Sequence, residues 1–290
     1  MPTKVLGELL GRSPGLTQHP VTIGSTEPCP FRTALHAQRH DSAAKKTWTS
    51  NCVKKSSVCS VYAGATGPAK SGLRQTSGLV CTCPSRFYEP HIIDEIAQHA
   101  WGKPPGTRFS VATEVSLGGK WYVDMALFTR DGSGNVRDFC SVEVQAIDIT
   151  NSVKKHVDAF VAQGRVAPAI KDPGLNWANA TIKRLFTQLL FKGYMHHVWG
   201  KKMAVVIQDK TLEYIEDTVT LATVPAMEKA DICILPYRYR EDSANSAAYT
   251  LELVENSVRR VPYGSFALST LSIQLPDIDQ HMQGFVRQMI

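Results

Sequence analysis

A carboxylate stands inside each of two consecutive apolar runs, and this feature constrains the fold of the chain more than any other. Asp124 lies in the first run, and Glu143 lies in the second, two residues before Gln145. A polar turn, Asp-Gly-Ser-Gly at 131–134, separates the runs, so the pattern predicts a β-hairpin. Because residues two apart on a strand point to the same face, Glu143 and Gln145 are expected to project together, beside Asp124 on the neighbouring strand.

Two carboxylates on one surface of a sheet can bind a hard cation such as magnesium, which takes oxygen ligands. The competing interpretation is a pair of solvated carboxylates on the wet face of an antiparallel sheet. Glu143 has apolar residues on both sides, which is typical of a central strand. A carboxylate there is costly to desolvate unless it is paired or binds a metal, so the pattern favours a magnesium site.

The excess of positive over negative charge is confined to the N-terminal third of the chain. Residues 1–85 carry ten Lys/Arg and three Asp/Glu, a net charge of +7, whereas residues 86–290 have a net charge of −1. Such a basic segment is expected to face a polyanion, although a merely soluble basic surface would have the same composition.

Cysteines are concentrated in the same third of the chain. Five of the seven lie between positions 29 and 83: Cys29, Cys52, Cys59, Cys81 and Cys83. In a cytoplasmic protein this clustering favours a zinc or iron site over disulfides. The irregular spacing leaves a few buried free thiols as the alternative. Cys140 and Cys233 lie in apolar runs and are expected in the core.

The chain has the composition of a soluble globular protein, with 43% hydrophobic and 20% charged residues among 290. No apolar run is long enough to span a membrane, and the N-terminus does not resemble a secretory signal, so a cytoplasmic location is expected. We expect an extended arm (1–28), a metal-binding DNA-recognition module (29–85) and a core domain (86–290). The apolar periodicity of the core predicts a helix from 87, strands at 107–117, 120–128 and 137–148, helices at 152–164 and 175–197, and strands at 202–208, 232–239 and 248–255.

The order helix–β–β–β–helix–β resembles the core of the PD-(D/E)XK nucleases, an α/β (α+β) fold with a mixed sheet, with Gln145 in place of the usual lysine. Three blocks further resemble the NotI family of restriction endonucleases. They are Cys29-Pro30-Phe31 with Asn51-Cys52-Val53-Lys54, Val58-Cys59 and Cys83-Pro84-Ser85-Arg86; the strand 142–148 with Ser152 and Lys154; and Leu175-Asn176, Asn179, Lys183-Arg184 and 186–188.

The resemblance implies a type II restriction endonuclease that cuts double-stranded DNA at long GC-rich palindromes as a homodimer, with a cognate DNA methyltransferase in the same system. It implies Asp124, Glu143 and Gln145 as the catalytic triplet, with Asp124 and Glu143 holding magnesium. It also implies a structural iron, for which zinc is the alternative, on Cys29, Cys52, Cys59 and Cys83. Cys81 remains an alternative to Cys83 as the fourth ligand.

Basic residues near these blocks are candidates for DNA contacts: Lys54, Lys55, Lys154, Lys183 and Arg184. The pair His196-His197 is expected at the surface of a helix end. Two other functions remain open from the sequence. One is a metal-stabilised DNA-binding regulator without catalysis, and the other is a repair or junction-resolving nuclease on the same core. The regulator would not explain the carboxylates within apolar strands.

Overall fold

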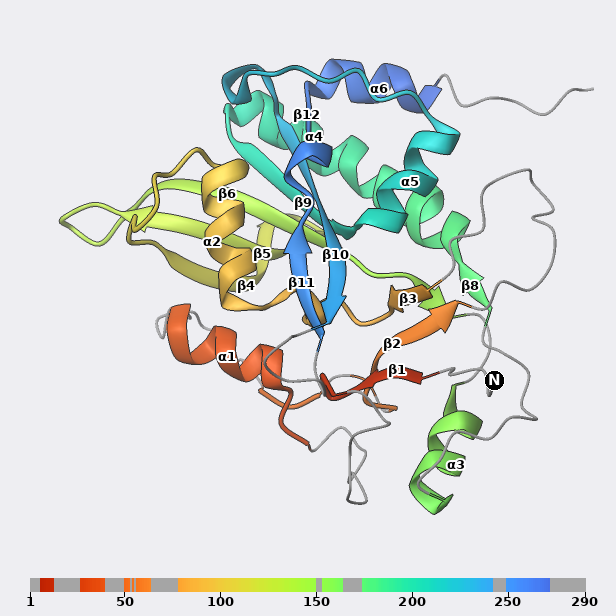
Figure 1. Cartoon of the computed structure of the whole chain (residues 1–290). Coiled ribbons are helices and arrows are strands. Elements are labelled where there is room, and N and C mark those ends of the chain that lie inside the picture. The colour runs from red at the N-terminus through yellow and green to blue at the C-terminus, as the bar shows by residue number, and fades with distance from the viewer. Residues whose placement is uncertain are drawn as a thin grey trace, which may run out of the picture.

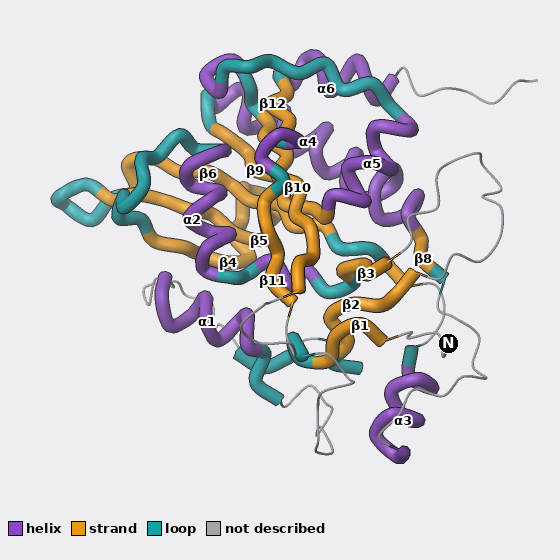
Figure 2. The backbone as a smooth tube through the Cα atoms, in the orientation of Figure 1, coloured by secondary structure: helices purple, strands orange, loops and turns teal. Residues whose placement is uncertain are grey.

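The computed structural model describes residues 6–12, 27–39, 50–52, 54, 56–63, 78–149, 153–163, 174–241 and 249–271. A seven-stranded mixed sheet forms the centre of the fold (Figures 1 and 2), which confirms the expected α+β class. Its strand order is β11-β10-β9-β6-β5-β4, with β12 paired to β10. The strands are β4 (Ser110–Gly118), β5 (Trp121–Arg130), β6 (Val136–Gln145), β9 (Lys202–Gln208), β10 (Ile232–Glu241), β11 (Tyr249–Leu253) and β12 (Arg259–Val261).

Two tight turns produce the antiparallel half of this sheet, as expected from the sequence. Gly118 and Gly119 join β4 to β5 with φ values of +107° and +59°, a conformation that glycine adopts without a Cβ clash. In the next turn the Asp131 carboxylate accepts the N–H groups of Ser133 and Asn135, each at 2.9 Å. The predicted three-strand meander is therefore confirmed.

Helix α2 (Pro90–His99) covers one face of the sheet. Pro90 occupies its first turn, where the missing N–H is tolerated, and Gly102 follows its end. Ile92, Ile93 and Ile96 pack against inward side chains of β4, β5, β6, β9 and β10. The two cysteines expected in the core, Cys140 and Cys233, are buried in this layer.

The opposite face carries a π-helical segment (Asn179–Phe186), α4 (Thr187–Trp199), α5 (Asp209–Thr218) and α6 (Tyr263–Leu271). They pack on alternate residues of β9 and β10, such as Val205 and Ile234. The predicted helix at 175–197 begins two residues later than expected. Leu175–Asn176 instead forms β8, which pairs with β7 (Asp148–Ile149), so these residues satisfy their backbone groups outside the helix.

The N-terminal third contains more regular structure than the sequence indicated. A small sheet has the order β1-β2-β3, made of Leu6–Leu9, Val58–Ala63 and Gly78–Cys81. Helix α1 (Pro30–Arg39) lies beside it, and α3 (Lys154–Gln163) packs on β1 and β2 through Val153, Val157 and Phe160 (Figure 1). The first strand therefore pairs within the region expected as a separate module. The division at residues 28 and 85 stays a prediction.

Two buried polar side chains join the small sheet to the core. Gln208, at the end of β9, accepts the N–H of Cys81 at 2.9 Å and donates to the carbonyl of Leu79 at 2.7 Å. Arg86 contacts Glu8 of β1, the carbonyl of Tyr249 and the ring of Phe31 in α1. The small sheet and the nuclease-like core are therefore packed as one body.

No helix in these described ranges is long and apolar enough to cross a membrane.

Candidate active site

The two carboxylates predicted from the sequence lie where β5 separates from β6. The last pair in their antiparallel register is Met125 with Val142, whereas β6 continues beside β9 as far as the pair Gln145 and Ile207. Beyond the separation the N–H of Val144 has no strand partner in β5, and it donates to Oδ2 of Asp124 at 2.8 Å. Asp124 thereby occupies the position that a backbone acceptor would take in a continued sheet.

Strand alternation directs Glu143 and Gln145 toward α4. Val142 and Val144 face the α2 core, so the residues between and after them face the opposite side. Glu143 receives a hydrogen bond from Nζ of Lys192 in α4, with 2.5 Å between Nζ and Oε1. Both side chains of this ion pair are only 5% exposed. Strand β6 therefore carries a buried, paired carboxylate.

Burial disfavours the ionised form of both acids, and the charge of Asp124 further disfavours ionisation of Glu143. The pKa of Glu143 is raised to about 7, first by burial and next by the nearby Asp124 charge, while Lys192 opposes both effects. Burial also raises the pKa of Asp124, against the Val144 N–H and the Lys192 charge. A cation between these side chains would relieve both effects.

Gln145 lies on the same face of β6 as Glu143, and no hydrogen bond among the described residues joins the two side chains. Its side chain is 6% exposed, and Nε2 donates to the carbonyl of Ala146 at 2.6 Å. An amide carries no charge, so Gln145 can orient a ligand by hydrogen bonds but cannot neutralise a carboxylate or phosphate.

Lys192 was not predicted from the sequence as a residue of this site. A single lysine among Leu189, Leu190 and Tyr194 resembles a solvated residue at the edge of an apolar helix face. Its partner is 49 residues away in the sequence, so no helical spacing indicates the pair. The spacing gave a weak signal that Lys192 is buried. Lys192 follows Leu189 by three residues, so the two side chains lie on the same face of the helix, and both are buried.

His196 was expected at the surface, and this expectation was wrong. Its side chain is fully buried between α4 and the sheet, where its ring lies near Phe139 and Trp199. Nδ1 bonds to the carbonyl of Lys192 at 2.7 Å, and burial lowers the pKa of the imidazole. His197 is the exposed member of the pair and lies 3.2 Å from Asp231.

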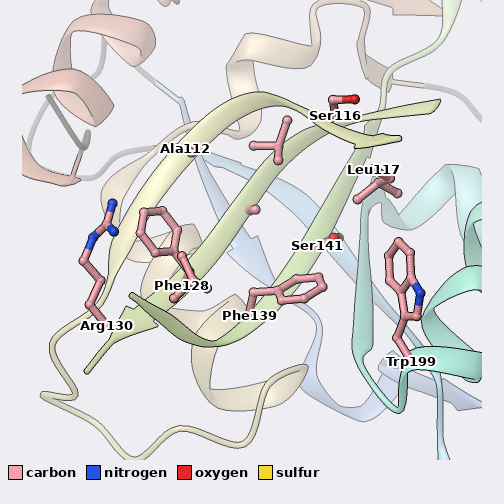
Figure 3. A pocket seen from close by; sticks show the side chains of 11 residues that line it. Ala112, Ser116, Leu117, Phe128, Arg130, Phe139, Ser141 and Trp199 are labelled. Atoms are coloured by element: carbon pink, nitrogen blue, oxygen red, sulfur yellow. The ribbon is translucent and has the colours of Figure 1, made fainter. Parts of the chain in front are cut away.

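An apolar pocket of about 380 Å³ adjoins the carboxylates on the same face of the sheet. Figure 3 shows Phe128 and Phe139 on neighbouring strands, with Trp199 entering from the end of α4. Ser141 lines it and lies two residues before Glu143, which is about 7 Å along the strand. The face of the sheet that bears Asp124 and Glu143 is therefore hollowed beside them.

Backbone hydrogen bonds bring the predicted metal-binding cysteines together in two pairs. The N–H of Cys29 donates to Ser50, and that of Cys52 donates to Glu27, which holds the first two side by side. The N–H of Cys83 donates to the carbonyl of Cys59 at 3.2 Å, which holds the second pair. All four side chains are buried, and all seven cysteines of the chain are free thiols.

The two pairs lie close enough for the cysteine thiols to raise one another's pKa values. Burial raises the pKa of Cys29, and the neighbouring Cys83 and Cys52 raise it further. Burial raises the pKa of Cys83, whereas Lys54 lowers it, so the predicted DNA-contacting lysine lies beside this group. Cys81 points instead toward the α2 core and donates to the carbonyl of Cys83 at 3.3 Å.

Within the described segments, no three His, Cys, Asp or Glu side chains are close enough together to form a metal-binding group. The cysteine sulfurs are therefore neighbours, but they are not gathered at coordination distance. Two carboxylates alone would not form such a group, and magnesium commonly binds through one or two carboxylates together with water and substrate phosphate.

The other predicted DNA contacts lie on the surface. Lys154 pairs with Asp158 at 2.6 Å, and Arg184 pairs with Asp148 at 2.8 Å. Lys183 is exposed beside Arg184 on the π-helical segment. Lys55 lies outside the described residues. Among the described hydrogen bonds and ion pairs, none joins Lys183 or Arg184 to Asp124 or Glu143, although the Arg184 charge lowers the pKa of Asp124.

A mixed sheet with two close carboxylates where its antiparallel strands separate defines a nuclease-like α+β protein. A family-model comparison agrees with this class. The chain belongs to the family described as Restriction endonuclease NotI, whose model matches residues 21–251. No curated protein matches the chain. The family makes the protein a type II site-specific deoxyribonuclease that acts on double-stranded DNA.

Proposed function

We propose that this restriction endonuclease makes magnesium-dependent, sequence-specific double-strand cuts, with Asp124, Glu143 and Gln145 as its catalytic triplet. The observation that carries the proposal is the convergence of Asp124 and Glu143 where β5 leaves β6. Two neighbouring acids whose pKa values are both raised by burial need a compensating cation, and a phosphodiester hydrolase can use one.

The residues at this position fit magnesium. Asp124 and Glu143 would hold the ion, and the Val144 carbonyl is a further oxygen at the same edge, because the N–H and C=O of one strand residue point the same way. When bound, magnesium would neutralise charge on the phosphate and lower the pKa of water.

The residues of the chain would then position the reactants. Gln145 orients the attacking water through hydrogen bonds. The water oxygen forms a bond to phosphorus, the bond from phosphorus to the leaving sugar oxygen breaks, and the proton lost by water balances the one that the leaving oxygen gains. Asp124 and Glu143 contribute geometry and negative charge, not a covalent bond.

We also propose that Cys29, Cys52, Cys59 and Cys83 hold one structural iron, for which zinc is the alternative. Four buried thiols in two backbone-linked pairs fit the donor set of a tetrahedral thiolate site. Cys83 is supported over Cys81 because it lies near Cys29 and Cys59, whereas Cys81 packs in the core. Lys54, beside this group, would then face DNA.

The resemblance noted in the sequence supports the finer parts of the proposal. They are a long GC-rich palindrome as the target, a homodimer that presents one active site to each strand, a cognate methyltransferase in the same system, and a cytoplasmic location. Lys55, Lys154, Lys183 and Arg184 remain candidates for phosphate contacts. No observation in the structure favours a regulator, and the buried acids argue against one.

The test is digestion of a large sequenced DNA by purified protein with magnesium, followed by mapping of the new ends. The expected result is a single sequence at every cut. Glu143→Ala should abolish cutting while it leaves calcium-supported specific binding and the fold intact. Cutting by Glu143→Ala at the wild-type rate would overturn the assignment of the active site.

A further inference from the structure

The active-site strand lacks the positive charge that its motif normally carries. Gln145 occupies that position, and its amide is turned to the carbonyl of Ala146. A neutral amide cannot offset the negative charge that builds up on a phosphate as it is attacked. Any ammonium near Glu143 therefore has to come from elsewhere in the fold.

Lys192 is the cation that the fold places there. Its Nζ lies 2.5 Å from Oε1 of Glu143, and its side chain is 5% exposed. Among the ion pairs of the described residues, the other one with both side chains this deeply buried joins Arg86 to Glu8, in the contact with the N-terminal sheet. Among the described ion pairs, the one that includes Glu143 is formed with Lys192.

Local packing holds Lys192 in this position. The next residue is Gly193, where an added Cβ would lie 3.0 Å from Cδ1 of Ile232, so the absence of a side chain lets α4 approach the sheet closely. The backbone carbonyl of Lys192 is fixed by Nδ1 of the buried His196 at 2.7 Å. The segment of α4 that carries Lys192 is therefore held close to the sheet, within reach of Glu143.

We propose that Lys192, supplied by α4, takes the electrostatic role of the lysine that the catalytic strand lacks. This inference rests on the proposed function. Before the metal binds, Lys192 holds Glu143 in place. If Glu143 held a divalent cation, the Lys192 ammonium would remain beside that carboxylate and would supply positive charge near the phosphate bound there. It then stabilises the charge on the attacked phosphate and transfers no proton.

A purely structural counter-ion would have different consequences. It would matter for folding, and its loss would not separate metal affinity from cleavage. In our proposal, Lys192 competes with the incoming cation for Glu143 but assists the chemical step. Removal of its charge should therefore strengthen metal binding and slow cleavage, an opposition that simple damage to the fold would not produce.

The experiment compares Lys192→Gln, Lys192→Arg and the control Lys229→Gln with the full-length wild-type protein. Gln keeps a hydrogen-bond donor for Glu143 but loses the charge, and Arg keeps the charge. Lys229 is an exposed lysine on the turn Met227–Lys229, away from the carboxylates. Thermal unfolding checks the fold, titration calorimetry measures calcium affinity without DNA, and single-turnover assays at saturating magnesium measure cleavage.

Lys192→Gln should cut roughly 100-fold more slowly, as for the loss of one transition-state donor, and bind calcium roughly three- to tenfold more tightly. Lys192→Arg should recover most of the cleavage, and Lys229→Gln should match the wild type. Cleavage and calcium affinity of Lys192→Gln within twofold of wild type would overturn the proposal. Equal losses in the Gln and Arg variants would also overturn it, because packing and not charge would then be responsible.

A further variant separates this inference from the proposed function. Glu143→Gln should bind calcium weakly and fail to cut if the carboxylate site is correct. If Glu143→Gln bound calcium and cut like the wild type, the proposed active site itself would be wrong. Normal behaviour of Lys192→Gln together with an inactive Glu143→Gln would reject only the role of Lys192.

Discussion

Nε of Arg86 lies 3.2 Å from both carboxylate oxygens of Glu8, and both side chains are fully buried. The pair joins the segment before α2 to the first strand of the chain. Removal of one partner leaves the other charge buried without compensation, which costs about 3–5 kcal/mol. Arg86→Met should therefore lower the free energy of unfolding by that amount, as measured by chemical denaturation.

The exposed pair Arg240 and Glu252 provides the matched control, since its side chains are 67% and 55% exposed. Arg240→Met should cost less than about 1 kcal/mol. Similar losses in the two variants would show that burial does not set the strength of the Arg86 pair.

Stability of the metal-free protein should fall as pH rises from 4.5 to 7. Glu143 in the fold has its pKa raised to about 7 from the ordinary 4.5, first by burial and then by Asp124. Between these values the unfolded chain releases a proton that the folded chain retains, so the unfolded state is favoured as pH rises. The free energy of unfolding in chelator should drop by roughly 1–3 kcal/mol over this range.

Glu143→Gln, which does not titrate, should lose most of this pH dependence. Denaturant titrations at pH 4.5, 6 and 7.5 would measure the difference. An unchanged slope in Glu143→Gln would show that another group is responsible.

Purified protein should contain about one thiolate-bound iron or zinc per chain. Cys52→Ser should lose the metal and destabilise the N-terminal region, because its backbone is paired with the segment of Cys29. Cys81→Ser should keep the metal, since its sulfur faces the core. Elemental analysis of the wild type, Cys52→Ser and Cys81→Ser measures the metal content of each protein. A folded, active wild-type preparation without metal would refute the metal site.

Specific DNA binding should weaken steeply with salt, and Lys54 should contribute to that dependence. Lys54 lies beside Cys83, in the basic third of the chain. If it contacts one phosphate, Lys54→Gln should reduce the slope of log affinity against log salt by about one. Binding measured in calcium at several salt concentrations tests this, and an unchanged slope would place Lys54 away from the DNA.

The sequence was sufficient to predict the central hairpins and the position of the carboxylates. Gly118, Gly119 and the 131–134 turn are local signals, and strand alternation then sets the faces of Asp124 and Glu143. These features depend on neighbours in sequence. The parts of the fold that depend on residues close together along the chain were therefore predicted correctly.

Features that depend on distant contacts were missed. Leu6–Leu9 is a four-residue strand that gains its stability only by pairing with Val58–Ala63. Lys192 and His196 were not recognised as buried because their partners lie on the sheet, far away in sequence. No periodicity in a single helix reveals which polar side chain a distant strand will neutralise.

The side-chain amide of Gln208 sets the position of the small N-terminal sheet relative to the strand that carries Glu143. It is bonded to both Cys81 and Leu79, and it extends from the strand that lies directly beside the Glu143 strand. Gln208 is only 2% exposed, so these buried hydrogen bonds hold the strand Gly78–Cys81 against the part of the sheet that carries Glu143. If the cysteine-bearing region reads the bases, the scissile bond lies at a constant distance from them, and the cut position is fixed by the fold.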